Sequence, residues 1–273
     1  EFASFYKSMG SEVTLIEMMD QILPAEDSEV AEKAKESFSS QGIRVLTGTG
    51  IESLEIKKNG LLASIAGAEE KFDAAILSVG VEGNTKGMGL EGLGVELEGG
   101  FVLVDEHQQT SVEGVYAIGD VSGVPCLAHK ASHEGIICAE AIAGELPLPI
   151  NKNRIPGCTY SYPQIASVGL TEREASGRGS IKIGRFPLLA NGKAVAVNDT
   201  EGMIKTIFDE KTGELLGAHM IGPGVTEMIQ GFVVAMSLET TEADLMATVF
   251  PHPTLSEAMH ESVLSAFGRT INF

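Results

Sequence analysis

Apolar and polar positions in the first 80 residues follow strand spacing at several points and helical spacing at one. Residues 1–9 have the pattern of a helix end, and VTLIE (residues 13–17) is a short β-branched run typical of a buried strand. Residues 27–41 place apolar or small side chains at helical spacing behind Asp27, a favourable N-cap residue. Further strands are predicted at IRVL, IESLEI, LLASIA and AAILSVG, with Asn59 and Gly60 as a two-residue hairpin turn. This order predicts a partial Rossmann-type nucleotide-binding unit of the α/β class, followed by a β-meander.

The middle of the chain has weaker periodicity. Residues 81–100 are rich in glycine, which is typical of loops, and two apolar strands are predicted at FVLV (residues 101–104) and VYAIGD (residues 115–120). A helix is predicted over residues 130–143. The segment 145–156 contains three prolines, so it is the best candidate for a linker between domains.

The remainder of the chain alternates strand and helix patterns. Strands are predicted at about 163–169, 180–186, 203–208 and 214–221, and helices at about 224–237, 241–247 and 254–267. This part therefore predicts an α+β domain with an antiparallel sheet. The whole chain divides into three expected parts, at residues 1–80, 81–150 and 151–273.

Charge and cysteine content narrow the function classes. The chain of 273 residues has 38 acidic against 19 basic side chains, a net charge of -19, which repels nucleic acid and anionic lipid. No apolar run approaches the roughly 20 residues of a membrane span. Cys126, Cys138 and Cys158 are too far apart in sequence for a metal pair or a short-loop redox pair, and no His, Cys and carboxylate spacing resembles a zinc site. We expect no nucleic acid, membrane or metal partner, and a reducing compartment.

The stretch PHPTLSEAMHES, residues 251–262, allows two interpretations. Thr254 and Glu257 fit the S/T-x-x-E capping box, which would make His252 an ordinary loop residue. Alternatively, Glu257 holds one imidazole nitrogen of His252 while the other faces a thiol or hydroxyl, as in acid/base catalysis. His219 has the position of a packed or interface histidine, and His260 fits either role. Spacing alone leaves both interpretations open.

Two further carboxylates lie at positions that suit a nucleotide ligand. Glu17 ends the first predicted strand, where a dinucleotide-binding unit places the acid that binds a ribose. Asp120 follows Gly119 just before a predicted helix, whose N-terminus suits an electron-rich group. The alternatives are a solvated glutamate and a plain turn.

Several motifs in order resemble one family. TSVEGVYAIGDVSG, PCLAHKASHEGIICAEAIAG, HPTLSEA and the ending AFGRTINF resemble the pyridine nucleotide-disulfide oxidoreductases, and the resemblance extends over essentially the whole chain. In that family a flavin passes electrons between a dithiol/disulfide pair and NAD, within a homodimer. The resemblance therefore implies FAD and NAD as cofactors. It also implies that the three parts are a partial NAD-binding domain, a central FAD-contacting region and a C-terminal dimerisation domain.

The resemblance also implies roles for individual residues. Asp120 would meet the FAD ribityl chain, and the backbone of four consecutive residues would line the flavin ring: Cys126, Leu127, Ala128 and His129. Relatives have methionine at the first of these four positions. Glu17 would bind the adenosine ribose of NAD, with Ile51 and Gly80 lining the same site. A carboxylate at position 17 repels a 2′-phosphate, which favours NAD over NADP. The segment after Gly80 reads VEGNT where relatives often have two arginines and a proline, so those contacts are not expected here.

His252 and Glu257 would be the catalytic acid/base pair. The resemblance implies that the imidazole takes a proton from dihydrolipoamide, because the thiolate is the nucleophile that attacks the redox disulfide. In this family the histidine serves the disulfide of the partner subunit, so a homodimer is required. The expected reaction oxidises protein-bound dihydrolipoamide and reduces NAD⁺. The expected partners are lipoyl domains of 2-oxo acid dehydrogenase complexes, in the cytoplasm or, in a eukaryote, the mitochondrial matrix.

The start of the chain bears on activity. Glu1 opens the sequence within a helical pattern and without Met, so we expect a fragment of a longer protein. Compared with the family, the FAD domain, the redox cysteine pair and the first strand and glycine turn of the NAD domain are missing. The 273 residues alone are therefore expected to bind FAD poorly and to be inactive. The alternative is a noncatalytic dimerisation or scaffold module related to the same family.

Overall fold

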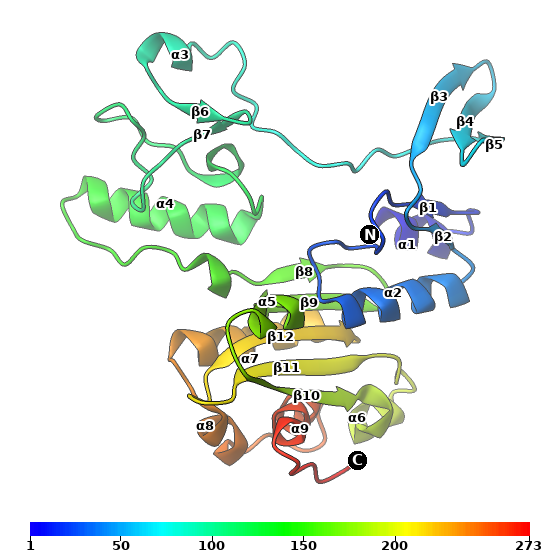
Figure 1. Cartoon of the computed structure of the whole chain (residues 1–273), viewed down its shortest axis with the longest axis vertical. Helices are drawn as coiled ribbons and strands as arrows, with labels where there is room; N and C mark the ends of the chain where they lie inside the picture. The colour runs from blue at the N-terminus through cyan, green and yellow to red at the C-terminus, as the bar shows by residue number, and fades with distance from the viewer. The chain divides into compact units, whose positions relative to one another are not determined.

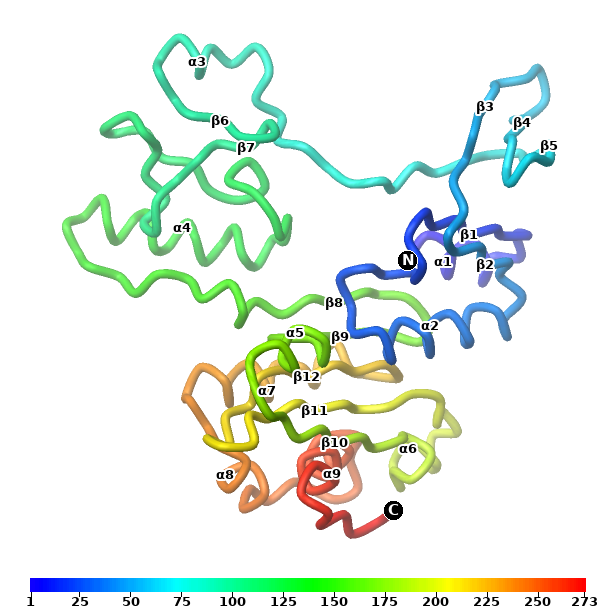
Figure 2. The backbone as a smooth tube through the Cα atoms, in the orientation of Figure 1, coloured from blue at the N-terminus to red at the C-terminus, as the bar shows by residue number.

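The computed structural model describes all residues from 1 to 273, and they form two compact units (Figures 1 and 2). The first unit joins residues 1–75 to residues 153–273, so it combines segments from both ends of the chain. The second unit consists of residues 76–152. No helix in either unit has the length and apolar character needed to cross a bilayer.

The N-terminal segment of the first unit forms the predicted α/β elements: α1 (Phe2–Ser8), β1 (Thr14–Ile16), α2 (Ser28–Ser40) and β2 (Arg44–Leu46). β1 and β2 pair in parallel, with Thr14 opposite Arg44. Asp27 caps α2, because its side chain accepts the N–H of Glu29 at 3.1 Å. The apolar face of α2 packs with Ile165, Met203 and Ile221 of the C-terminal sheet.

The predicted meander is present but its third strand was misplaced. β3 (Ile51–Lys57), β4 (Gly60–Ile65) and β5 (Ala68–Phe72) form an antiparallel sheet. The two-residue turn lies at positions 58 and 59, one residue earlier than predicted, because Gly60 already pairs with Lys57.

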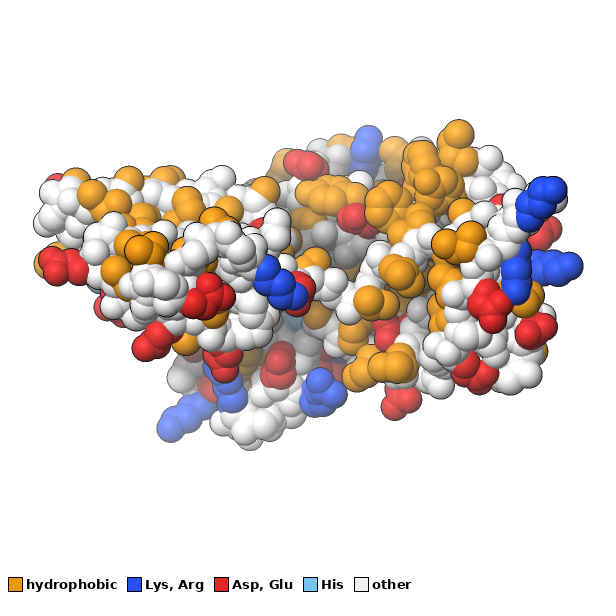
Figure 3. Space-filling model, turned by 90° about the horizontal axis from the view of Figure 1, so that it is seen from above, with side chains coloured by type: hydrophobic (Ala, Val, Ile, Leu, Met, Phe, Trp, Pro, Cys, Tyr) orange, Lys and Arg blue, Asp and Glu red, His pale blue; other side chains and the backbone are white.

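The strand predicted at residues 74–80 was wrong. This segment has no regular secondary structure, no strand of the chain pairs with it, and Ile76, Leu77 and Val79 are 50%, 69% and 91% exposed. Many hydrophobic side chains are exposed on the face of the molecule shown in Figure 3. The polar sequence of β5 was overlooked because it lacks apolar alternation, and its pairing with β4 is what makes it a strand.

The second unit contains mainly loops around one long helix. Its elements are α3 (Leu90–Leu93), β6 (Leu97–Glu98), β7 (Phe101–Val102), the 3-10 turn η1 (Gly119–Ser122) and α4 (Ala128–Ile142). The helix prediction is confirmed, whereas the strand predicted at 101–104 is shortened to two residues. The strand predicted at 115–120 was wrong, because this segment makes only isolated bridges before the turn. Gly119 adopts φ +76 there, which ends an extended segment.

The C-terminal part of the first unit is the predicted antiparallel α+β domain. Its sheet has the order β10-β11-β12-β9-β8, and every neighbouring pair is antiparallel. The strands are β8 (Gly157–Thr159), β9 (Gln164–Gly169), β10 (Ile181–Pro187), β11 (Met203–Asp209) and β12 (Leu215–Gly222). The helices are α5 (Glu172–Ser176), α6 (Gly192–Ala196), α7 (Val225–Ser237), α8 (Glu242–Ala247) and α9 (Glu257–Ala266), and two short 3-10 turns are η2 (Lys152–Arg154) and η3 (Leu188–Ala190). The short elements β8, α5 and α6 were not predicted.

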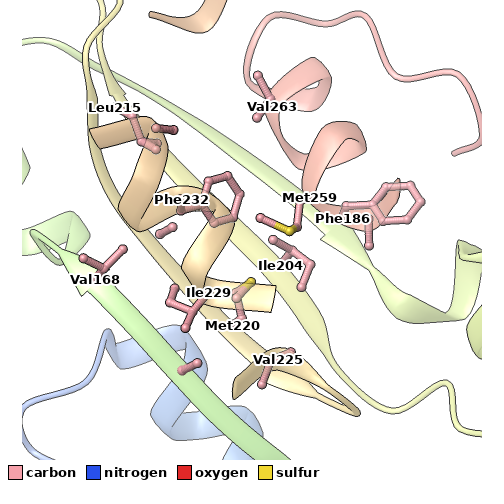
Figure 4. Packing of buried hydrophobic residues seen from close by; sticks show 14 of the residues in the cluster. Val168, Phe186, Ile204, Leu215, Met220, Val225, Ile229, Phe232, Met259 and Val263 are labelled. Carbon is pink, nitrogen blue, oxygen red and sulfur yellow. The ribbon is translucent and has the colours of Figure 1, made fainter. Parts of the chain in front are cut away.

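Alternation along β11 explains how the sheet uses both faces. Ile204 and Phe208 both belong to the main core. In Figure 4, Ile204 lies close to Met259 of α9, on the same side of the sheet as Phe232 of α7. Met203 packs on the other face with the residues of α2. Lys205 is therefore placed by the two-residue period on the face of the sheet that α2 covers. Gly184 of β10 allows close approach of α9, since a Cβ at this position would lie 1.7 Å from the Ser262 carbonyl oxygen.

Candidate functional site

His252 lies in the loop before α9, between Pro251 and Pro253. Its side chain is 76% exposed, and Nδ1 lies 2.9 Å from Oε1 of Glu257. The other ring nitrogen, Nε2, makes no hydrogen bond within the chain. The structure thus brings together the two residues predicted as an acid/base pair, with one edge of the imidazole held and the other open.

The predicted capping box is not formed. α9 begins at Glu257 after Ser256, and the Thr254 hydroxyl donates to the Pro251 carbonyl at 2.7 Å instead of capping the helix. The Glu257 carboxylate divides its two oxygens between two partners: Oε1 faces His252, and Oε2 accepts the N–H of Thr254 at 2.9 Å. Of the two hydrogen bonds of a capping box, only the one from the Thr254 N–H to Glu257 is present, because α9 begins at Glu257 and Thr254 is not its N-cap residue.

The electrostatics favour an ionised Glu257. Partial burial works to raise its pKa, but the hydrogen bonds from the Thr254 N–H and from His252 outweigh burial and hold the pKa below its ordinary value. A carboxylate of this kind keeps a proton on Nδ1 of a neutral imidazole, which leaves Nε2 as a hydrogen-bond acceptor. An exposed imidazole with a free Nε2 can accept a proton from an approaching group.

The other two histidines considered from sequence have structural contacts. His219 is 2% exposed on β12, and its Nε2 lies 2.8 Å from the Leu170 carbonyl oxygen, so it is a packed residue. Nε2 of His260, on α9, lies 3.0 Å from the Met246 carbonyl oxygen. The ring of His260 also stacks on Phe250, with 5.1 Å between the ring centroids. His260 also lines a surface pocket of about 350 Å³ that borders Glu257.

Two of the residues predicted to bind NAD, Glu17 and Ile51, belong to the first unit. Glu17 follows β1, and its Oε1 accepts the N–H of Met19 at 2.8 Å while its carbonyl accepts the N–H of Thr49. Ile51 lines a surface pocket of about 250 Å³ formed mainly by the loop that contains Thr49. Gly80 belongs to the second unit. Glu17 and the pocket loop are therefore neighbours at the carboxyl end of a parallel strand, which suits a ribose ligand.

The residues predicted to meet FAD lie together in the second unit. Asp120 is exposed within the turn η1, and α4 starts a few residues later. Its N-terminus has no side-chain cap, since Leu127 is the N-cap residue and Ala128 opens the helix. Cys126 is a free thiol, and His129 continues the first turn. A carboxylate beside an uncapped helix N-terminus fits a ligand with hydroxyl and ring acceptor groups.

Lys130 and Glu134 of α4 form a buried pair that sequence reasoning missed. Their charged groups are 3.0 Å apart and their side chains are 3% and 5% exposed. Glu134 Oε2 accepts the Gly119 N–H at 2.7 Å, and Lys130 donates to the Gly119 and Gly123 carbonyls at 3.2 and 3.0 Å. The pair therefore holds the backbone that carries Asp120. The sequence did contain a signal for this pair. Lys130 and Glu134 lie four residues apart in a helix that otherwise has many small and apolar residues, and such a spacing brings two side chains together.

No group of three or more His, Cys, Asp and Glu side chains is arranged to hold a metal ion.

Two family models match this chain. The model for pyridine nucleotide-disulphide oxidoreductases matches residues 1–135, and the model for the dimerisation domain of the same proteins matches residues 155–263. Dihydrolipoyl dehydrogenase from Zymomonas mobilis is 55% identical over 280 residues, and the same enzyme from Bacillus subtilis is 41% identical over 285. Each alignment includes 100% of this chain, which spans 60% and 59% of the two relatives.

Solved structures agree with the sequence relatives. LpdA from Mycobacterium tuberculosis superposes with a TM-score of 0.89 at 29% identity, covering 96% of this chain and 58% of that protein. The HOCl-induced flavoprotein disulfide reductase RclA from Escherichia coli gives a TM-score of 0.89 at 27% identity, covering 96% and 61%. The predicted fold class is confirmed. With both family models matching in order, the chain belongs to the pyridine nucleotide-disulphide oxidoreductase family.

Proposed function

We propose that this chain is the NAD-binding, central and dimerisation part of a dihydrolipoyl dehydrogenase. The observation that carries the proposal is the exposed imidazole of His252 held at 2.9 Å by the Glu257 carboxylate. Relatives that carry this enzyme name are 55% and 52% identical to the entire chain. A noncatalytic scaffold would not need an exposed imidazole with one nitrogen fixed and the other open.

The proposed work of the pair is proton transfer at sulfur. Dihydrolipoamide would approach Nε2 of His252, which takes the thiol proton, and the resulting thiolate attacks a disulfide. Glu257 fixes the orientation of the ring and stabilises the imidazolium that forms, because its carboxylate is ionised and hydrogen-bonded. When bound, FAD would supply the two-electron relay between the reduced dithiol and NAD⁺.

The proposed cofactor contacts follow from the resemblance to the family. Asp120 would bind the FAD ribityl chain, with Cys126, Leu127, Ala128 and His129 along the ring. Glu17 would bind the ribose of NAD, beside the pocket that Ile51 lines, and Gly80 would line the same ligand.

The match to a dimerisation domain supports a homodimer in which His252 serves the partner's disulfide. Lipoyl domains of 2-oxo acid dehydrogenase complexes would be the protein substrates, in the cytoplasm or the mitochondrial matrix.

The test separates the two half-reactions of the holoenzyme that contains this chain. His252→Gln should lower dihydrolipoamide oxidation by about 10²–10⁴-fold, the range typical of a lost general base. Reduction of the flavin by NADH, followed by stopped-flow absorbance, should persist, because it needs no thiol proton. His133→Gln is the matched control, since His133 is exposed on α4. Equal loss of both half-reactions in His252→Gln, or normal thiol oxidation, would contradict the proposed function.

A further inference from the structure

Asn191 joins α6 to the loop that carries His252. Asn191 is the N-cap residue of α6 and is 3% exposed. Its side-chain Oδ1 accepts the N–H of Ala194 at 2.9 Å. Its Nδ2 donates to the backbone carbonyl of Thr254 at 3.0 Å, across 63 residues of sequence. The two ends of one amide thus serve different partners, the helix start and the loop.

This contact is the one hydrogen bond that ties residues 251–254 to a segment outside the loop and α9. Pro251 and Pro253 have no backbone N–H to donate. The Thr254 hydroxyl bonds the Pro251 carbonyl at 2.7 Å, the Thr254 N–H bonds Glu257, and His252 bonds Glu257. All of these hydrogen bonds are internal to residues 251–257, so they fix the shape of the loop but not its place on the sheet.

The contacts form a continuous series from the fold to the imidazole. The Asn191 amide donates to the carbonyl oxygen of Thr254. The backbone N–H of Thr254 in turn donates to Oε2 of Glu257 at 2.9 Å. Glu257 then holds Nδ1 of His252 through its other oxygen. A change at Asn191 would therefore be transmitted to His252 through three hydrogen bonds in series.

The capping role does not explain why this residue carries an amide. Serine and aspartate cap helices as well as asparagine does, because a cap needs only the side-chain acceptor. The Nδ2 donor is used only by the Thr254 carbonyl. We infer that Asn191 is a positioning residue for the acid/base pair, acting through Thr254 and Glu257. This inference rests on the proposed function of His252.

Two substitutions remove the donor and keep the cap. In the holoenzyme, Asn191→Ser retains an acceptor for the Ala194 N–H but cannot reach Thr254. We expect about a tenfold to hundredfold loss of the dihydrolipoamide half-reaction, since small displacements of a catalytic group have effects of this size. Flavin reduction by NADH should stay within about twofold of wild type, because the NADH half-reaction does not use the pair.

Asn191→Asp gives a readout that a structural role alone would not produce. An ionised carboxylate cannot donate to the Thr254 carbonyl, whereas a protonated one can. The ratio of the Asn191→Asp rate to the wild-type rate in the thiol half-reaction should therefore rise as the pH falls. The same ratio for Asn191→Ser should stay flat. Should Asn191→Ser fold poorly, this pH-dependent ratio still tests the inference.

The matched control is loss of a helix cap elsewhere in the first unit. Thr171 caps α5 through the N–H of Glu174, and no hydrogen bond connects Thr171 to residues 251–254. Thr171→Ala should leave both half-reactions unchanged.

The inference is overturned if Asn191→Ser oxidises dihydrolipoamide like wild type, or if both half-reactions fall together. If His252→Gln is impaired while Asn191→Ser is not, only this inference fails. If His252→Gln is unimpaired, the proposed function itself fails.

Discussion

Lys205 joins α2 to the C-terminal sheet through a buried cluster of charges. Its side chain on β11 is 1% exposed, and Nζ lies 2.7 Å from Asp27 Oδ1, 2.6 Å from Glu172 Oε2 and 3.1 Å from Glu29 Oε2. Asp27 is also 1% exposed. Arg185 shares Glu29 and Glu172, at 2.7 and 2.9 Å. Three carboxylates from two distant segments therefore meet one buried ammonium.

The directions of the pKa shifts indicate that Lys205 and Asp27 are both charged. Burial works to lower the pKa of Lys205, but the hydrogen bonds to Asp27 and Glu172 outweigh it and raise that pKa. Burial likewise works to raise the pKa of Asp27, yet the Lys205 ammonium and the Glu172 N–H hold it below its ordinary value. The pKa of Glu29 is lowered for similar reasons, with Arg185 as the strongest partner against burial.

Lys205→Met should destabilise the first unit by about 3 kcal/mol at neutral pH. Methionine fills a similar volume, but Asp27 then stays buried without its ammonium, and removing one partner of a buried pair typically costs about 3–5 kcal/mol. We expect a loss at the lower end of this range, because Arg185 still pairs with Glu29 and Glu172, whose side chains are 32% and 37% exposed. About 3 kcal/mol corresponds to roughly a hundredfold change in the unfolding equilibrium.

The assay is urea unfolding monitored by hydrogen exchange of the backbone amides of β11 and α2. Because both elements belong to the first unit, their exchange reports on the stability of that unit alone. Lys182→Met is the control. Lys182 lies on the neighbouring strand β10 and pairs with Glu210 at 3.9 Å near the surface, so a change below about 1 kcal/mol is expected. A Lys205→Met protein as stable as wild type, or more stable, would refute the reasoning, because it would show that apolar packing replaces the cluster without loss.

The pH dependence of the same variant has a defined sign. Asp27 and Glu29 have folded pKa values below their unfolded ones, so their contribution is present in full above about pH 5 and is lost as the pH falls through the folded values. The difference in unfolding free energy between wild type and Lys205→Met should therefore narrow in acid. A difference that stays constant down to about pH 2 would show that these carboxylates are not the cause.

Two further predictions concern other buried titratable side chains. Lys130→Met should loosen the turn at Gly119, because it breaks the buried 3.0 Å pair with Glu134 and two hydrogen bonds to the turn; faster hydrogen exchange of the turn amides is expected, and unchanged protection would contradict it. His219 should make stability depend on pH, since burial lowers its pKa more than the Leu170 carbonyl raises it. The unfolded chain then binds a proton first, so this contribution is complete above about pH 6.5 and is lost as the pH falls further. The stability difference between wild type and His219→Gln should shrink over this interval, and a constant difference would contradict the assignment.

Long elements with clear periodicity could be predicted from the sequence. Helix α2, the four longer strands of the C-terminal sheet and α7 and α9 occur close to where apolar spacing placed them. The prediction failed at residues 74–80, where the apolar run resembles a strand but has no partner in the chain, and at 115–120, where side chains of α4 bind the backbone in place of a strand. Pairing partners are properties of the fold, so composition could not reveal them.

The sequence by itself predicted that Glu257 lies within reach of His252, because only five residues separate them, but it left open whether the carboxylate caps a helix or holds the ring. It also determined the net charge and the order of α/β and α+β segments. Only the tertiary structure decided which distant groups meet. Asn191 reaches Thr254 across 63 residues and Lys205 reaches Asp27 across 178, because neighbouring strands and helices bring these positions together. No local pattern encodes such contacts, since the free energy that makes them comes from burying whole elements against one another.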